Sequence, residues 1–157
     1  MGLFHLTDGL NAALIALLLY ACVTDWRERI IPHSVNAAIA VLGVLSWWAH
    51  GWHLWPEGAM QLGLSIGVLA VFALFQAFGM MGGGDVKMLG ALALWFPWPV
   101  MFGLLLVMSI FGGLLTTAML IRHKMGKHEG KPEIPYGIAI AFSGLFIICE
   151  HYLNHFS

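Results

Sequence analysis

The sequence predicts an all-α membrane protein with six transmembrane helices and both termini on the outer side of the membrane. The prediction rests on the composition, the lengths of the apolar runs and the positions of the basic residues. Of the 157 residues, 60% are hydrophobic and only 10% are charged, whereas a soluble domain carries about 25% charged residues. We therefore expect one helical bundle that is solvated mainly by lipid.

Six apolar runs approach the ~20 residues that a helix needs to cross a bilayer. Short breaks that contain charged residues, proline or glycine separate them. The predicted spans cover residues of about 6–25, 34–55, 58–79, 80–98, 99–121 and 134–153. Together they make a single transmembrane domain over residues 1–157.

The basic residues support this count independently of hydropathy. All seven fall in alternate breaks, after the first, third and fifth spans: Arg27, Arg29, Lys87, Arg122, Lys124, Lys127 and Lys131. Lys and Arg gather in cytoplasmic loops, and a miscount by one span would destroy the segregation. The pattern therefore predicts six helices with both termini outside.

The first apolar run is expected to stay in the protein. It contains Asp8 and no Lys or Arg, so the basic segment that begins a cleaved secretory signal is missing. Cys22 and Cys149 lie in separate apolar runs and form no CxxC pair, so we expect neither a disulfide framework nor a zinc site.

Two aspartates are predicted to lie on the cytoplasmic side. Asp25 closes the first span and Asp85 opens the fourth. The run 86–96 is too short to cross ~30 Å of hydrocarbon, so the crossing should begin near Met80 and place Asp85 below the membrane surface. An ionisable residue at that depth is costly, and it marks a candidate functional site.

Two carboxyl groups that approach each other closely cannot both ionise, so they titrate as a pair. Such a pair suits peptide hydrolysis, because one group takes a proton from water while the other hydrogen-bonds the scissile carbonyl. The structural alternatives are that Asp25 caps a helix or pairs with Arg27 or Arg29, and that Asp85 is the N-cap of the fourth span.

Three glycines precede Asp85 as Gly82-Gly83-Gly84. Without side chains, this segment lets an extended substrate backbone approach the carboxylate closely. A tight turn or a helix-packing contact would use the same residues, so the glycines alone do not decide between these interpretations.

Two separated segments resemble the signatures of the type IV prepilin peptidases, which are polytopic aspartic proteases with a GxGD motif. The first runs from Asp25-Trp26-Arg27 to Ile31-Pro32, and the second is Gly82-Gly83-Gly84-Asp85-Val86-Lys87-Met88-Leu89. A third similarity is Ile134-Pro135-Tyr136-Gly137. The segments follow the family's order and span most of the chain.

The resemblance implies that Asp25 and Asp85 are the catalytic aspartates. Lys87 is then expected to tune Asp85 or to meet the substrate backbone, although a basic residue that snorkels to the interface fits equally well. Pro135 also fits an ordinary first-turn residue. The further motif and substrate-binding candidates are Arg27, Gly82, Gly83, Gly84, Lys87, Pro135, Tyr136 and Gly137.

The implied reaction is removal of the leader from a prepilin or pseudopilin precursor at the cytoplasmic face of the bacterial inner membrane, with the termini in the periplasm. No metal, cofactor or nucleic acid is expected. His33 and Ile138 depart from the family pattern, which usually has Asn and Pro there. The short break after Asp25 resembles the peptidase-only form of tight-adherence (Flp) pilus systems, so methylation of the new N-terminus is not expected.

Other functions fit the sequence less well. The pairs His50 and His53, and His151 and His155, have helical spacing but lack nearby acidic partners for a metal. Presenilin-like proteases share GxGD but are larger. A small transporter or proton or cation channel would use Asp25 and Asp85 within the membrane, yet the second, third and fifth spans offer few polar residues to line a path.

Overall fold

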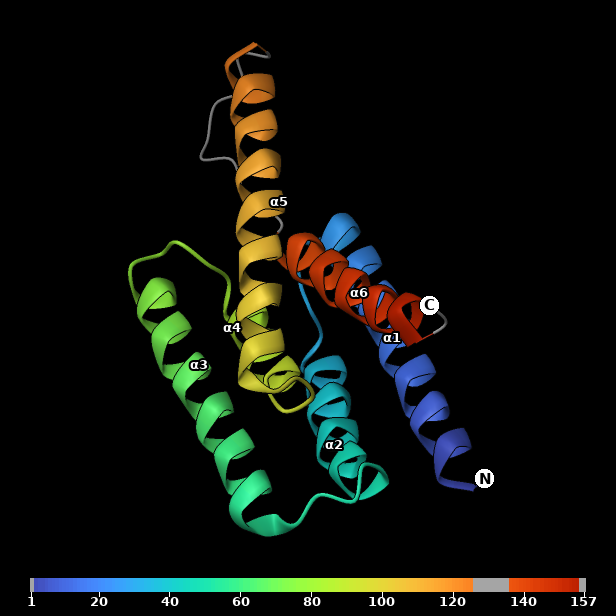
Figure 1. Ribbon diagram of the computed structural model, residues 1–157. Helices are drawn as coiled ribbons and strands as arrows, with labels where there is room; N and C mark the ends of the chain where they lie inside the picture. Colours follow the sequence, from blue (N-terminus) through green and yellow to red (C-terminus); the bar gives the residue numbers. More distant parts are fainter. Residues whose placement is uncertain (1, 126–135, 156–157) are drawn as a thin grey trace.

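The computed structural model is all-helical and describes residues 2–125 and 136–155. Six α-helices in the described residues run in alternating directions along the bundle (Figure 1). They are α1 (Gly2–Glu28), α2 (His33–Ala49), α3 (Ala59–Ala77), α4 (Gly83–Leu92), α5 (Trp98–Met125) and α6 (Tyr136–His155), with the short segment η1 (Leu54–Gly58) before α3.

The largest difference from the predicted spans is at α4. We expected a helix over 80–98, but α4 covers only Gly83–Leu92, and residues 93–95 form a turn before α5. The helix therefore begins three residues after Met80. The other predicted spans each coincide with one helix, apart from differences at the ends.

The outer surface of the bundle is apolar. Three segments of the described chain are long and apolar enough to cross a membrane, namely Leu6–Glu28, Leu54–Ala77 and Trp98–Ile121. Ile66 of α3 and Phe102 of α5 are more than half exposed, as is usual for side chains that face lipid and not water. The chain is therefore an integral membrane protein, while the number of crossings and the side of the termini stay predictions.

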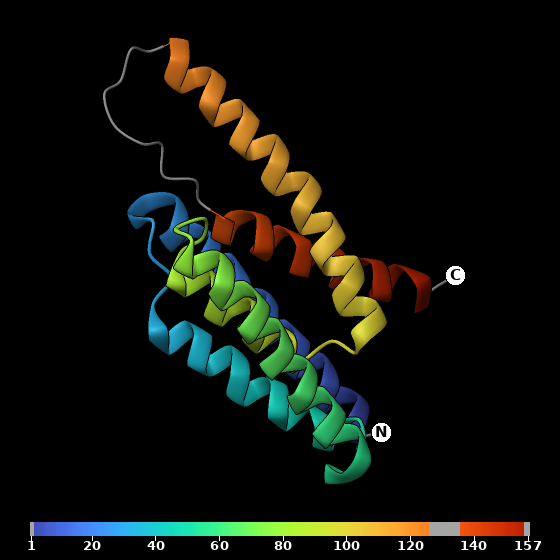
Figure 2. The ribbon, with the colours of Figure 1, turned by 90° about the vertical axis from the view of Figure 1, so that its left-hand side faces the viewer.

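Helix α4 lies at the centre of the bundle. It packs against α2, α3 and α6, and every residue from Asp85 to Leu92 except Lys87 is buried. Helix α6 packs against α1 and α5, and the C-terminal half of α5 extends beyond the other helices (Figure 2). The short α4 is thus enclosed by longer helices.

Side chains from α2 and α3 bind the carbonyl groups at the C-terminal end of α4. The last carbonyls of a helix have no partner within it, and leaving them unpaired in an apolar interior is costly. The bonds are Ser65 Oγ to Gly90 O (2.7 Å), Gln61 Nε2 to Ala93 O (2.8 Å) and to Phe96 O (2.6 Å), and Trp47 Nε1 to Leu94 O (2.8 Å). This network explains how α4 can end inside the bundle.

Candidate active site

Asp25 and Asp85 line one cavity of about 240 Å³, which we call the aspartate cavity. Asp25 lies near the end of α1 and Asp85 in the first turn of α4. Their exposed fractions are only 4% and 7%, and their carboxyl groups are close enough to interact electrostatically. The remaining lining residues are Arg29, Ile30, Ile31, His33, Gly82, Gly83 and Gly84.

The carboxylate of Asp25 is held by the start of α6. Its Oδ2 accepts a hydrogen bond of 3.0 Å from the backbone N–H of Ile138. The first N–H groups of a helix lack partners within it, and the helix dipole there favours negative charge. The alternative that Asp25 caps a helix is therefore correct in part, because Asp25 binds the N-terminus of α6. The carboxylate also faces the cavity.

Asp85 is not the N-cap of α4. The N-cap is Gly82, with no side-chain capping bond. Oδ1 of Asp85 is buried and accepts no hydrogen bond from the described residues. Since buried polar atoms are normally paired, this oxygen is suited to bind a water molecule or a substrate.

Glycines fit closely around both aspartates. A Cβ added at Gly84 would lie 3.2 Å from Ile31 Cβ and 3.4 Å from Ile31 O. A Cβ at Gly137 would lie 2.7 Å from Asp25 Oδ2 and 2.8 Å from Ile31 Cδ1. At Gly83 it would meet mainly the side-chain amide of Gln76, at 2.9 Å. Of these three, Gly84 and Gly137 therefore stand where the site leaves no room for a side chain.

Residues 12–117 match the model of the type IV leader peptidase family. This chain belongs to that family. The match begins within α1 and ends within α5, and so includes both aspartates and the three glycines before Asp85.

Individual relatives agree with this assignment. The prepilin leader peptidase/N-methyltransferase of Aeromonas salmonicida (strain A449) is 28% identical over 144 residues, which cover 87% of this chain and 48% of the relative. The protein of the same name from Stutzerimonas stutzeri is 30% identical over 133 residues, 81% of this chain and 44% of the relative. The prepilin peptidase EppA of Methanocaldococcus jannaschii is 37% identical over 86 residues, 55% of this chain and 23% of the relative.

The chain spans about half the length of the first two of these relatives, and less of the third. The comparison with solved structures gave no match.

Two residues support the leader peptidase motifs: Asn36, which sequence reasoning missed, and Ile31, which it named only as part of the first signature. Asn36 of α2 donates a hydrogen bond of 3.0 Å from Nδ2 to the carbonyl of Gly84. Its Oδ1 is buried and accepts no hydrogen bond from the described part of the chain. Ile31 packs against both Gly84 and Gly137. A polar residue in the apolar run 34–55 was the available signal for Asn36, because burial of an amide needs a partner.

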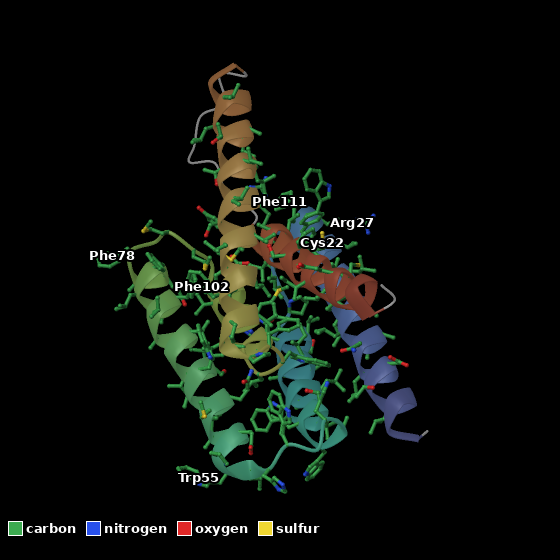
Figure 3. All side chains as sticks on the ribbon, in the orientation of Figure 1. Cys22, Arg27, Trp55, Phe78, Phe102 and Phe111 are labelled. Atoms are coloured by element: carbon green, nitrogen blue, oxygen red, sulfur yellow. The ribbon has the colours of Figure 1, made fainter. Side chains whose placement is uncertain are left out.

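Other predicted site residues lie away from the aspartates. Arg27 is exposed near the end of α1 and does not line the cavity, whereas Arg29 does (Figure 3). The Tyr136 ring lies near Gly112 of α5. Lys87 is exposed and lines a second hollow. Pro135 lies outside the described residues.

The described residues contain no group of three or more His, Cys, Asp or Glu side chains placed to hold a metal ion. That the reaction uses no metal or cofactor stays a prediction from the sequence.

Proposed function

We propose that this protein is an intramembrane aspartic endopeptidase that removes the leader peptide of prepilin-like precursors. The observation that carries the proposal is the aspartate cavity, in which α1 and α4 of a leader peptidase family member contribute two buried carboxyl groups. Its volume of about 240 Å³ holds several water molecules, each of which occupies ~30 Å³ in the liquid.

In this proposal the two carboxyl groups share one proton, because like charges at close range disfavour double ionisation. The ionised group takes a proton from a water molecule as that water attacks the scissile carbonyl. The protonated group hydrogen-bonds the carbonyl oxygen and then helps the leaving amine depart. The bond from Ile138 to Oδ2 orients the Asp25 carboxyl group, and Oδ1 of Asp85, which accepts no hydrogen bond from the described residues, is available for these steps.

We assign the aspartate end of the bundle to the cytoplasmic face of the bacterial inner membrane. The C-terminal end of α1, which bears Asp25, lies at the same end of the bundle as the α3–α4 connection (Figure 1), and Arg27 and Arg29 follow Asp25 closely in the chain. Basic residues are retained on the cytoplasmic side. Both termini are then periplasmic, and the substrate's basic leader stays in the cytoplasm.

We propose the peptidase reaction alone. The connection between α1 and α2 consists of residues 29–32, so it holds no cysteine-containing insert of the kind expected in bifunctional members. Cys22 and Cys149 are both free thiols.

Transport through the aspartates is less favoured. The side chains that pack below them, such as Leu18, Leu89 and Ile140, are apolar and fully buried. A proton or cation relay from the aspartates would have to bypass these apolar side chains.

The decisive experiment is cleavage of a precursor with a basic leader and an apolar helix in isolated membranes. Asp25→Asn and Asp85→Asn should each lower the cleavage rate by at least about 100-fold, because each change removes one half of an acid-base pair. Asp8→Asn changes an exposed aspartate on α1 and should have no effect. Near wild-type cleavage by either of the first two variants, with unchanged thermal unfolding, would refute the assignment.

The orientation is tested separately with single cysteines at Glu57 and Phe78, in a protein that lacks Cys22 and Cys149. Both positions are exposed, and Trp55, two residues before Glu57 in the chain, lies at the opposite end of the bundle from Phe78 (Figure 3). A membrane-impermeant thiol reagent should label Glu57→Cys in intact cells and Phe78→Cys only after lysis. The reverse pattern would invert the topology.

A further inference from the structure

A second hollow of about 320 Å³, which we call the α4 groove, lies between α2, α3 and α4. Helices α2 and α4 run in the same direction away from the aspartates (Figure 1). The lining extends over eight positions in each of two segments, 33–40 in α2 and 87–94 in α4 and the turn that follows it, which corresponds to ~10 Å of helix. The groove therefore leads from the level of the aspartates into the bundle.

The groove adjoins the aspartate cavity. His33 lines both hollows. Asn36, which also lines the groove, donates its hydrogen bond to the carbonyl of Gly84, the residue before Asp85. A chain segment that lies in the groove would thus have one end beside the aspartate cavity.

The walls of the groove suit an apolar polypeptide segment. The small residues Ala37 and Ala40 of α2 and Ala91 of α4 line it, and small residues let another helix or an extended backbone approach closely. Leu69 and Leu94 add apolar surface.

Polar groups gather where the groove meets the aspartate cavity. Asn36 is only 5% exposed, and its Oδ1 accepts no hydrogen bond from the described residues. A buried amide oxygen is costly without a donor, and the backbone N–H of a peptide is a suitable one. Lys87 lies at the same end and offers a donor.

We propose that the α4 groove binds the apolar segment that follows the scissile bond of the precursor, with Asn36 Oδ1 accepting a backbone N–H where that segment enters. This inference rests on the proposed function. An apolar segment is stabilised in a groove at membrane depth, whereas a basic leader is stabilised in water. Adjacency to the aspartate cavity, through the shared lining residue His33, favours the precursor over a lipid chain as the occupant.

The test adds bulk to the groove and compares two substrates in detergent micelles. One is a synthetic polypeptide with a basic leader, the scissile bond and an apolar segment of ~20 residues. The other has the same leader and bond but lacks the apolar segment. Ala37→Leu and Ala40→Leu should each lower kcat/KM for the long substrate at least tenfold, mainly by raising KM. For the short substrate, kcat/KM should change less than twofold.

Ala70→Leu is the matched control, since Ala70 is an exposed alanine of α3 next to the groove residue Leu69 but outside the lining. Ala70→Leu should leave kcat/KM unchanged for both substrates. Unchanged cleavage of the long substrate by Ala37→Leu and Ala40→Leu would overturn the inference, and a lipid chain would then be the favoured occupant of the groove. An equal loss with both substrates would also overturn it. Failure of the unaltered enzyme to cleave either substrate would instead refute the proposed function, and the inference with it.

Cross-linking provides a readout that needs no cleavage. In an Asp85→Asn protein without Cys22 and Cys149, Ala40→Cys should form a disulfide with a single cysteine in the apolar segment of the long substrate. Ala70→Cys should not. Equal cross-linking at the two positions, or none at Ala40→Cys for any cysteine position along the segment, would contradict the proposed occupancy.

Discussion

The two ends of α4 differ in whether their buried polar groups have hydrogen-bond partners. At the C-terminal end, Ser65, Gln61 and Trp47 bind the carbonyls that the helix leaves open. At the N-terminal end, Oδ1 of Asp85 and Oδ1 of Asn36 are buried and accept no hydrogen bond from the described residues. One end of the helix is fixed by a complete network, and the other keeps two acceptors available.

This difference teaches how a short helix can carry a reactive carboxyl group inside a bundle. A site holds its geometry only if neighbouring groups fix the element that bears it. The bonds to the C-terminal end fix α4 along and around its axis. The acceptors at the N-terminal end then bind substrate or water without also having to hold the helix.

Among changes to the residues around α4 other than Asp85, the largest expected effect comes from filling the space at the N-terminal end. In Gly84→Ala the new methyl group would lie 3.2 Å from Ile31 Cβ, so Ile31 or α4 must shift by a few tenths of an ångström and cleavage of the long substrate should fall at least tenfold. Gly83→Ala is the adjacent control, because its methyl group meets mainly the movable side chain of Gln76, and it should retain most activity. Equal activities of the two variants would show that contact with Ile31 does not set the position of Asp85.

A smaller effect is expected from Asn36→Leu, which removes the bond to the Gly84 carbonyl but keeps the side-chain volume. A hydrogen bond contributes about 0.5–1.5 kcal/mol, which corresponds to a loss of roughly 2–13-fold in kcat/KM if the bond positions the loop. Asn36→Gln, which keeps the amide, should recover part of the loss. If Asn36→Leu were as active as the unaltered enzyme, Asn36 would have no role in positioning the site.

The smallest effect on activity should come from Gln61→Leu, at the C-terminal end. This change leaves the carbonyls of Ala93 and Phe96 without their donor, which should lower the free energy of unfolding by about 1–3 kcal/mol. The folded fraction should cleave within twofold of the normal rate, because Asp85 lies at the other end of α4. Denaturation in mixed micelles measures the stability.

Ser109→Ala is the control for Gln61→Leu, since Ser109 bonds only the carbonyl of Leu105 within α5, and it should be as stable as the unaltered protein. If Gln61→Leu instead lost activity without losing stability, the contrast between the two ends of α4 would be wrong.

Much of the fold was predictable, because segments that cross lipid must be apolar and because basic residues mark the breaks between them. The six helices and the family followed from these patterns and from the two aspartate signatures. The length of α4 was not predictable, because residues 93–96 are apolar and read as part of a span. Their carbonyls are bound by side chains distant in sequence, such as Gln61, and hydropathy carries no sign of such partners.

The aspartates were predictable as a pair, but their surroundings were not. Asn36 meets Gly84 across 48 positions, and Ile138 meets Asp25 across 113. Neither pair has a characteristic spacing. Arg27 and Arg29 both follow Asp25, and only the backbone at the end of α1, where Arg29 has a φ of 54°, determines that Arg29 lines the cavity.

Ile31 has a mechanical consequence for the enzyme. Its side chain packs between Gly84, which precedes one aspartate, and Gly137, which adjoins the other. One branched hydrocarbon group therefore works as a spacer of fixed width between α4 and α6. Adding or removing one methyl group at position 31 should therefore change the distance between the two aspartates. Ile31 sets this distance although it takes no part in proton transfer.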